Sequence, residues 1–384
     1  MNSAWKIKFR EVLLLSLISI IFTCFISCRS SKFASTEGKN QAETIFAEYS
    51  NAIATAEKLS DNEEFDKLFL NKGIVTLKGN EIKNLSQFRV GKNGNIYICD
   101  YDQKLVNQYD SLGNNVTSIG NTGNKPGSHV FPTDVAEIQN SSIAIADFQG
   151  HRVNVFSKDG SFDSSFIYTP QNFSAQRVIY NNANDSYYLF GNRWETNEND
   201  EIIGADLLHK YSSKGDYLTS HLQFPDEAKA LDLYSYDSPA SDLNEGNIYL
   251  ALPFDYTVYR LTAKDELSVF LKGDKPDFVT PKTKMSASKV NPADSYKLFQ
   301  TWRLKWTPIV SLAVLNGKLL VQYQSFNPLR YTIDVWSIPT KKLETTIKTN
   351  YMLLNRGLDN NLFFLKNLES KEQATYEIIR AEIR

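Results

Sequence analysis

A pattern of alternating apolar residues repeats along the chain, and this repeat constrains the fold more than any other feature. Residues 131–162 contain three short apolar runs separated by polar turns, at 135–138, 143–146 and 153–156. Alternation with a period of two is typical of β-strands, and the closing Asp159-Gly160 pair suits a tight hairpin turn. One such meander cannot bury its own faces, so its copies must pack against one another.

The unit recurs in both directions along the chain. Asp100 and Asp147 end two similar strands, and fainter copies follow around residues 187–191, 248–252, 319–323 and 362–365. Six units of about four strands predict an all-β fold, a six-bladed β-propeller, in which each blade packs on its neighbours around a central channel. The isolated apolar run at 74–77 precedes the first unit, and we expect it to form the outer strand of the sixth blade and close the ring.

The composition is consistent with β structure and argues against one class of partner. The 384 residues include 23 Phe and 20 Tyr, which favour half-buried pleated surfaces. Forty-two Lys and Arg residues against 44 Asp and Glu give a formal net charge of −2. A chain without excess positive charge does not attract phosphate backbones, so nucleic acid is not an expected partner.

The N-terminus has the pattern of an export signal. Three basic residues precede an apolar run at 12–22 that is too short to span a membrane comfortably. Residues 25–28, Phe-Ile-Ser-Cys, resemble a bacterial lipobox, whose cysteine receives lipid and becomes the new N-terminus. We therefore expect a signal peptide over residues 1–27 and a lipid anchor on Cys28. Ordinary cleavage or an uncleaved anchor are the alternatives.

The next segments predict a tether and then the globular part. Residues 28–41 are rich in Ser, Lys, Gly and Thr without any period, which is typical of a flexible linker. Residues 42–59 space apolar side chains at helical intervals, so we expect a short amphipathic helix at the start of a propeller domain over 42–384. Cys99 lies in an apolar run and is expected to be a buried, unreactive thiol.

The second repeat unit resembles the NHL repeat. Residues 132–136 (PTDVA), 143–147 (IAIAD) and 151–160 (HRVNVFSKDG) match the NHL pattern of P-x-x-V-A, then a strand ending in A-D, then H-R before a strand and D-G. The specific match covers about residues 88–162. Together with the lipobox, the chain is similar to the six-bladed propeller lipoproteins of Bacteroidetes. That group has no common activity, so the resemblance implies architecture more than function.

The sequence shows no assembled catalytic or metal-binding motif. The four His residues occur singly, without the spacing of paired metal ligands, and neither a nucleophile elbow nor a phosphate-binding loop is found. Asp100 and Asp147 recur at the same place in adjacent units, which favours a local role as acceptors of backbone N–H bonds over paired catalytic carboxylates. We therefore predict no catalytic residue, no cofactor and no metal.

Binding residues are expected where the repeat is broken. Counting back from the recurrent strand end places Gln87, Asp134 and Arg177 at the starts of the first three inner strands. Asp232 lies near the equivalent place in the fourth. These starts face the channel mouth, so such a polar ring could bind a ligand, although any wet channel is lined by polar groups.

A second candidate is the stretch at 192–205, whose acidic, Asn-rich composition predicts a loop in the third blade. Arg193 and Trp194 lie in it, and an exposed Trp beside an Arg suits a sugar or a protein surface. Tyr256 is expected in the equivalent loop of the next blade.

The third candidate is the long insertion at 272–307. A segment of that length without a strand pattern is usually functional or mobile. Trp302 and Trp306, four residues apart, could share one helix face and either pack on the propeller or contact a ligand.

Three hypotheses about function follow. The leading one is a non-enzymatic binding module, lipid-anchored in the bacterial cell envelope with the outer membrane as the expected membrane, that recognises a protein, peptide or glycan. A scaffold within an envelope complex differs from it only in having an obligate partner. The alternative is a propeller enzyme resembling the gluconolactonase group, or a lyase, with a divalent metal held in the channel by Glu137, Asp134 and Asp232, although no spacing singles these residues out.

Overall fold

The computed structural model describes residues 62–78, 82, 85–91, 94–168, 173–196, 198, 202–226, 228, 239–282, 302, 304–326, 329–357, 361–366 and 376–384. The predicted signal peptide (1–27), tether (28–41) and helix (42–59) lie outside this part. Among the described residues, no helix is both long and apolar enough to cross a membrane.

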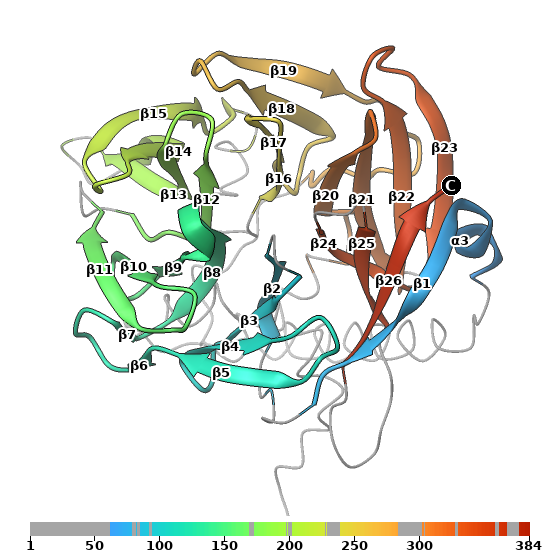
Figure 1. Cartoon of the computed structure of the whole chain (residues 1–384). Coiled ribbons are helices and arrows are strands. Elements are labelled where there is room, and N and C mark those ends of the chain that lie inside the picture. The colour runs from blue at the N-terminus through green and yellow to red at the C-terminus, as the bar shows by residue number, and fades with distance from the viewer. Residues whose placement is uncertain are drawn as a thin grey trace, which may run out of the picture.

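Six four-stranded antiparallel sheets are arranged around a central axis as the blades of a propeller (Figure 1). The predicted fold class and blade number are therefore confirmed. The inner strands are β2 (Leu85–Val90), β8 (Pro132–Glu137), β12 (Arg177–Asn181), β16 (Ala240–Asn244), β20 (Ile309–Leu315) and β24 (Met352–Arg356). The second strands are β3 (Ile96–Asp100), β9 (Ile143–Asp147), β13 (Ser186–Thr196), β17 (Asn247–Ala251), β21 (Lys318–Phe326) and β25 (Asn361–Lys366). We number the blades 1 to 6 in this order.

The outer half of each blade follows the same order. The third strands are β4 (Leu105–Tyr109), β10 (Arg152–Phe156), β14 (Ile202–Ser212), β18 (Thr257–Leu261), β22 (Leu329–Ser337) and β26 (Glu377–Ile383). The outer strands are β5 (Asn115–Ile119), β11 (Phe162–Ile167), β15 (Tyr217–Gln223), β19 (Leu267–Lys272), β23 (Leu343–Thr349) and, for blade 6, β1 (Phe69–Thr76). A short parallel pair, β6 (Asn121–Thr122) and β7 (Ser128–His129), joins blades 1 and 2, and a 3-10 turn, η1 (Gln139–Ser141), connects β8 to β9.

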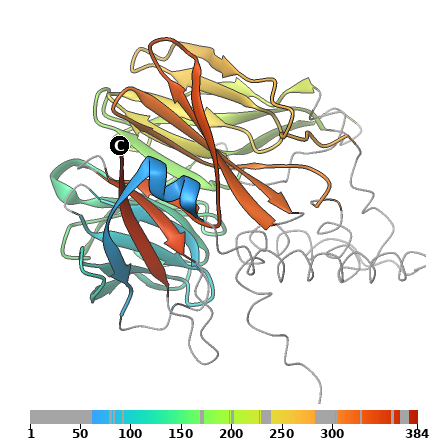
Figure 2. The ribbon, with the colours of Figure 1, turned by 90° about the vertical axis from the view of Figure 1, so that its right-hand side faces the viewer.

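Strand β1 closes the ring, as the run at 74–77 predicted. It pairs antiparallel with β26 from Phe69 opposite Ile383 to Thr76 opposite Glu377, so the two ends of the propeller share one sheet. The preceding helix α3 (Glu63–Leu68) packs beside β1 and β23, at the junction of blades 5 and 6 (Figure 2).

The core consists of six apolar clusters, one at each junction between neighbouring blades. The junction of blades 1 and 2 contains Cys99, which is fully buried as expected, against Val135 and Ile145. Trp302 and Trp306 from the long insertion are buried at the junction of blades 3 and 4, with ring centroids 5.1 Å apart. Both tryptophans therefore pack in the core.

The recurrent Asp at the end of the second strand holds its turn, as the repeat predicted. The Asp147 carboxylate accepts hydrogen bonds from the backbone N–H groups of Phe131 (2.8 Å), Val130 (3.0 Å) and Gly150 (3.0 Å). A Cβ at position 150 would lie 2.2 Å from the Asp147 Oδ2 atom, so the turn requires glycine there. The carboxylate is thus committed to the backbone.

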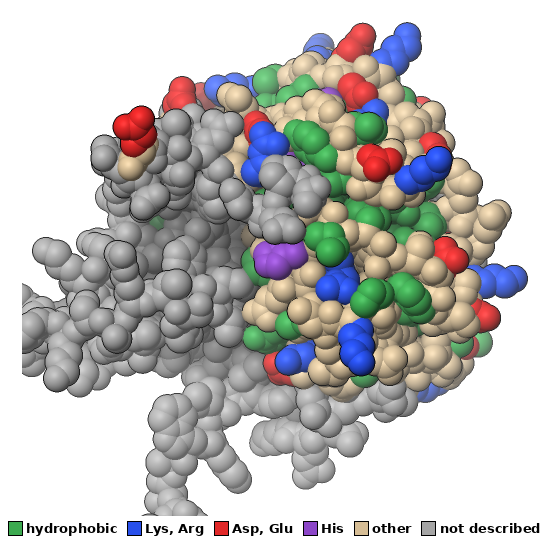
Figure 3. All heavy atoms as spheres, turned by 90° about the vertical axis from the view of Figure 1, so that its left-hand side faces the viewer, with side chains coloured by type: hydrophobic (Ala, Val, Ile, Leu, Met, Phe, Trp, Pro, Cys, Tyr) green, Lys and Arg blue, Asp and Glu red, His purple; other side chains and the backbone are tan. Residues whose placement is uncertain are grey.

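The outer strands expose isolated apolar side chains, among them Phe162, Ile167 and Leu218. On the side formed by β11 and β15, hydrophobic side chains stand among Lys, Arg, Asp and Glu (Figure 3). Charged neighbours on an edge strand discourage pairing with a strand of another molecule.

Replacing Phe69 by Ala tests the closure of the ring. Phe69 is 1% exposed in the cluster that joins β1 to blades 5 and 6, so Phe69→Ala should lower the free energy of unfolding by about 3–5 kcal/mol. Its neighbour Leu70 is 42% exposed, and Leu70→Ala should change that free energy by less than about 0.5 kcal/mol. Urea denaturation of both variants measures the difference. Equal effects would show that β1 does not close the ring through Phe69.

Candidate functional site

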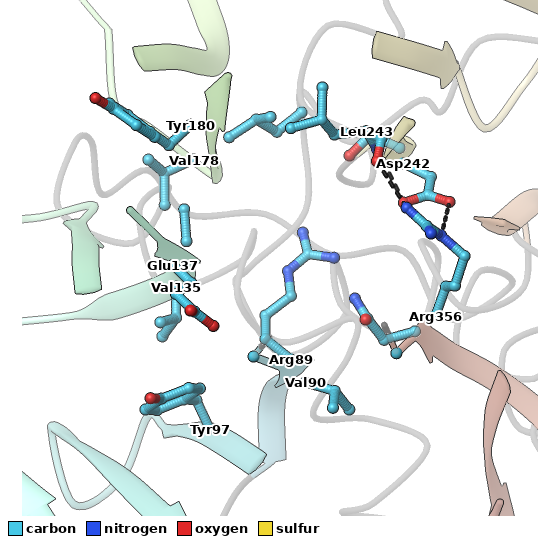
Figure 4. A pocket seen from close by; sticks show the side chains of 16 residues that line it. Arg89, Val90, Tyr97, Val135, Glu137, Val178, Tyr180, Asp242, Leu243 and Arg356 are labelled. Atoms are coloured by element: carbon cyan, nitrogen blue, oxygen red, sulfur yellow. Dashed lines mark hydrogen bonds and ion pairs between the residues drawn. The ribbon is translucent and has the colours of Figure 1, made fainter. Parts of the chain in front are cut away.

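A cavity of about 170 Å³ lies within the channel, toward the C-terminal ends of the inner strands (Figure 4). Charged and aromatic side chains from five blades line it, including Arg89, Glu137, Tyr180, Asp242 and Arg356. Typical sites for drug-sized ligands have roughly 300–1,000 Å³. This cavity therefore fits a small molecule or one group of a larger partner.

An ion pair across the channel forms one wall of the cavity. Arg356 on β24 donates from Nε to Asp242 on β16 (3.1 Å) and from its terminal nitrogen to the Leu243 carbonyl (2.8 Å), and Figure 4 shows the pair. Asp242 also accepts from the backbone N–H groups of Leu243 (2.9 Å) and Val314 (2.7 Å). Burial raises the pKa of Asp242, and Arg356 partly offsets this effect. One carboxylate thus joins blades 4, 5 and 6.

A second ion pair has the same construction on the opposite side of the channel. Arg89 donates through two nitrogens to the Asp134 carboxylate, at 2.8 and 2.9 Å. Asp134 also accepts from the backbone N–H groups of Val135 (2.9 Å) and Val178 (3.0 Å). This fully buried carboxylate therefore joins blades 1, 2 and 3. Asp134 was predicted to bind a ligand, but each of these hydrogen bonds joins its carboxylate to another group of the same chain.

The predicted ring of inner-strand starts exists as a set of equivalent positions. Gln87, Asp134 and Arg177 each pair with the fourth residue of the recurrent pattern in the second strand, namely Cys99, Ala146 and Phe190. The side chains at these positions differ in burial. Gln87 is buried and donates to the Phe88 carbonyl at 3.3 Å, whereas Arg177 is partly exposed.

In blade 4 the equivalent position is held by Ala240, which pairs with Ala251. Asp232, the residue predicted near that place, lies outside the described residues. The ring is thus polar in the first three blades and apolar in the fourth.

The prediction of a loop at residues 192–205 is wrong. Strands β13 and β14 continue through most of it as a long hairpin, in which Arg193 pairs with Asp206 and Trp194 with Ala205 in register. Trp, Thr and Ile in these strands favour β structure, but the acidic residues between them interrupt the alternation of apolar residues that identifies a strand. The Arg193 guanidinium is ion-paired with Asp206 and donates to the Tyr217 hydroxyl (3.2 Å). The Trp194 side chain lies outside the described part of the chain.

Tyr256 lies in the connection between β17 and β18, as predicted, but its side chain is buried and not accessible to a ligand. It is 2% exposed at the junction of blades 4 and 5. Its hydroxyl donates to Asp334 (2.6 Å) and accepts from the Trp336 indole (3.0 Å). Burial raises the pKa of Tyr256, so the hydroxyl stays protonated and joins the two blades.

Within the described residues, no group of three or more His, Cys, Asp or Glu is placed to hold a metal ion. Of the three proposed metal ligands, Asp134 is engaged by Arg89 and two backbone N–H groups, Glu137 lines the cavity, and Asp232 is outside the described part.

Comparison with known proteins agrees with this architecture. Residues 51–309 match a family of 6-bladed beta-propellers, DUF5128. The chain belongs to this family. No curated protein matches the sequence.

Two solved Bacteroides structures share the family's fold. A Bacteroides fragilis protein thought to be exported aligns with a TM-score of 0.60 at 15% identity, over 83% of this chain and 96% of that one. A DUF4221 member from Bacteroides vulgatus aligns with a TM-score of 0.54 at 10% identity, over 82% of this chain and 98% of that one. At these identities the likeness concerns the fold alone.

Asp134→Ala tests whether this DUF5128 propeller depends on the channel ion pairs. The variant leaves Arg89 and two backbone N–H groups without their acceptor, and breaking a buried pair typically costs about 3–5 kcal/mol of the free energy of unfolding. Asp163 on β11 is exposed, and Asp163→Ala should cost less than about 0.5 kcal/mol. Urea denaturation gives both values. A near-neutral Asp134→Ala would mean that the carboxylate is not part of the structural framework.

Proposed function

We propose that this protein is a binding module of the bacterial cell envelope, held to the membrane by lipid on Cys28, which recognises a protein, peptide or glycan partner at the channel cavity. The observation that carries the proposal is the cavity itself, in which charged and aromatic side chains from five blades converge.

The cavity is built on a rigid frame. Asp242 and Arg356 are fixed to each other and to the backbone, and Arg89 is fixed by Asp134. Side chains that are already oriented lose little conformational freedom when a ligand binds, so such a frame favours recognition. The small volume suits one protruding group of the partner, such as a side chain, a chain terminus or a single sugar ring.

The lipobox-like residues 25–28 and the linker that follows them support the proposed lipid anchor. The NHL-like second blade and the structural likeness to an exported Bacteroides candidate support the same assignment. A lipid on Cys28 and the tether at 28–41 would hold the propeller beside the membrane, with its cavity free to meet a partner.

An enzyme is the second candidate, and Asp242 is the observation that favours it. A carboxyl group with a raised pKa in a cavity is a candidate for proton transfer. In a lactonase-like or lyase-like reaction with a metal in the channel, the Asp242 carboxyl group would transfer the proton within the cavity. A divalent cation bound one-to-one in the purified protein would favour the enzyme over the binding module.

Filling the cavity tests the binding role. Ala136 lines the cavity and borders the apolar cluster between blades 2 and 3, so Ala136→Trp should occupy the cavity without removing a charged pair, and an unchanged Tm shows that the variant is folded. Asp163→Trp places the same ring on the exposed outer strand β11. When the three proteins are used to capture material from envelope extracts, quantitative mass spectrometry should find at least one component about tenfold depleted only with Ala136→Trp. An identical set of components with all three proteins would place the binding surface elsewhere.

Replacing Cys28 tests the anchor. Cys28→Ser removes the thiol that would receive lipid, so the protein should move from the membrane fraction to the soluble fraction of the envelope and lose incorporation of labelled palmitate. Cys99→Ser is the matched control, because Cys99 is buried within the propeller and should not affect partitioning. Membrane association of Cys28→Ser equal to that of the wild type would contradict lipidation.

A further inference from the structure

A serine and a histidine lie side by side in the outer half of blade 3. Ser220 on β15 and His209 on β14 are opposite each other in the register of the sheet, and the Ser220 Oγ and His209 Nδ1 atoms are 2.8 Å apart. The other ring nitrogen, His209 Nε2, lies 2.9 Å from the Gly191 carbonyl oxygen. Because a carbonyl oxygen only accepts, Nε2 carries the proton, and Nδ1 accepts from the Ser220 hydroxyl.

Two further side chains continue this chain of hydrogen bonds on the side of the serine. The Tyr217 hydroxyl lies 2.8 Å from Ser220 Oγ, and Arg193 donates to the Tyr217 oxygen at 3.2 Å. Since Ser220 gives its proton to His209, the Tyr217 hydroxyl is the donor in its bond to Ser220. All donors therefore point from Arg193 toward His209, and the Ser220 proton is directed at a nitrogen that can take it.

The first two blades hold a different pair at this place. Asn107 is opposite Ser118 in blade 1, and Asn154 is opposite Ser165 in blade 2, in the same register as the pair in blade 3. Ser118 donates to the Asn107 amide oxygen at 2.7 Å, so the structural contact needs no histidine. An amide cannot take a proton from the serine, whereas a neutral imidazole can. Blade 3 therefore places a base where the other two blades have an amide.

The pair is open to solvent on the side of the serine and enclosed on the side of the histidine. His209 is fully buried against Phe173, with ring centroids 4.3 Å apart, whereas Ser220 is partly exposed and Tyr217 is 37% exposed. Burial lowers the pKa of His209 to about 4, although the Gly191 carbonyl raises it. The imidazole is therefore uncharged at neutral pH and can act as a base, but as a weak one, so we expect slow turnover.

We propose that Ser220 is a nucleophile and His209 its general base, and that the pair cleaves small carboxylic esters at the outer side of blade 3. A nucleophile, a base within hydrogen-bond reach and a third group that orients the base are the parts that acyl transfer requires. The Tyr217 hydroxyl, supported by Arg193, lies next to Ser220 Oγ and can donate to the oxyanion that develops there. This activity goes beyond the proposed function, because none of these residues lines the channel cavity.

The reaction needs water as its only co-reactant. Ser220 Oγ attacks the ester carbonyl carbon while its proton passes to His209 Nδ1, and the bond from that carbon to the alkoxy oxygen breaks. The departing oxygen takes the proton from Nδ1, which leaves an alcohol and an acyl-serine. A water molecule then gives a proton to Nδ1 and attacks the acyl carbon. The carboxylic acid leaves, and the proton returns to Ser220 Oγ.

A fluorophosphonate, which phosphonylates activated serines with loss of fluoride, tests the pair in the full chain purified in detergent. We expect peptide mass spectrometry to find the adduct on Ser220 but not on Ser118, which is exposed and bonded to an amide. His209→Asn installs the pair of blade 1 and should slow the labelling of Ser220 at least about a hundredfold, the usual size of a general-base contribution. Hydrolysis of p-nitrophenyl acetate should fall in the same way in Ser220→Ala.

A purely structural histidine would leave the labelling unchanged. Labelling of Ser220 at the wild-type rate in His209→Asn would therefore overturn the inference, as would equal labelling of Ser118 and Ser220 in the wild type. The absence of any adduct on Ser220 at millimolar probe concentrations would overturn it as well. The comparison of the two serines is made within the wild-type protein, so it decides the question even if His209→Asn does not fold.

Discussion

The packing of each blade against its neighbours is the constraint on which the rest of the structure depends. No blade covers its own apolar faces, so the six clusters form only when the ring is complete. Completion requires β1 to pair with β26, which joins residues from the two ends of the described chain. The position of the channel, and of everything that lines it, follows from that closure.

The closed ring brings six inner strands together and forces their polar side chains into a confined space. Charges buried there must be paired, and the protein pairs them in one repeated way. Asp134 and Asp242 each accept from the next residue, from the backbone of the following blade and from an arginine of another blade. The same pairs stabilise the ring and orient the cavity walls, so the structural framework and the candidate site share residues.

Local signals in the sequence predicted the parts of the fold that repeat. The apolar run at 74–77 lacked a partner in its own unit, which was sufficient to assign it to the last blade. Asp147 recurred with its turn, which identified it as a cap. The register of the inner strands also follows from the repeat, and for this reason Gln87, Asp134 and Arg177 occupy equivalent positions.

Contacts between distant parts of the chain could not be predicted in this way. Asp242 and Arg356 are 114 residues apart and meet only because the ring closes. A single charged residue in an inner strand that carries no other charge, such as Arg89 in β2 or Arg356 in β24, was the one available signal. The hairpin of β13 and β14 was missed because its acidic composition resembles that of a loop, and Tyr256 was misjudged because burial at a blade junction is not visible from turn residues.

A crystal structure of the protein with its captured partner tests the central claim most directly. The account predicts ligand density in the channel cavity, between Arg89 and Tyr180. Ligand density on the outer strands, with only water in the cavity, would contradict it.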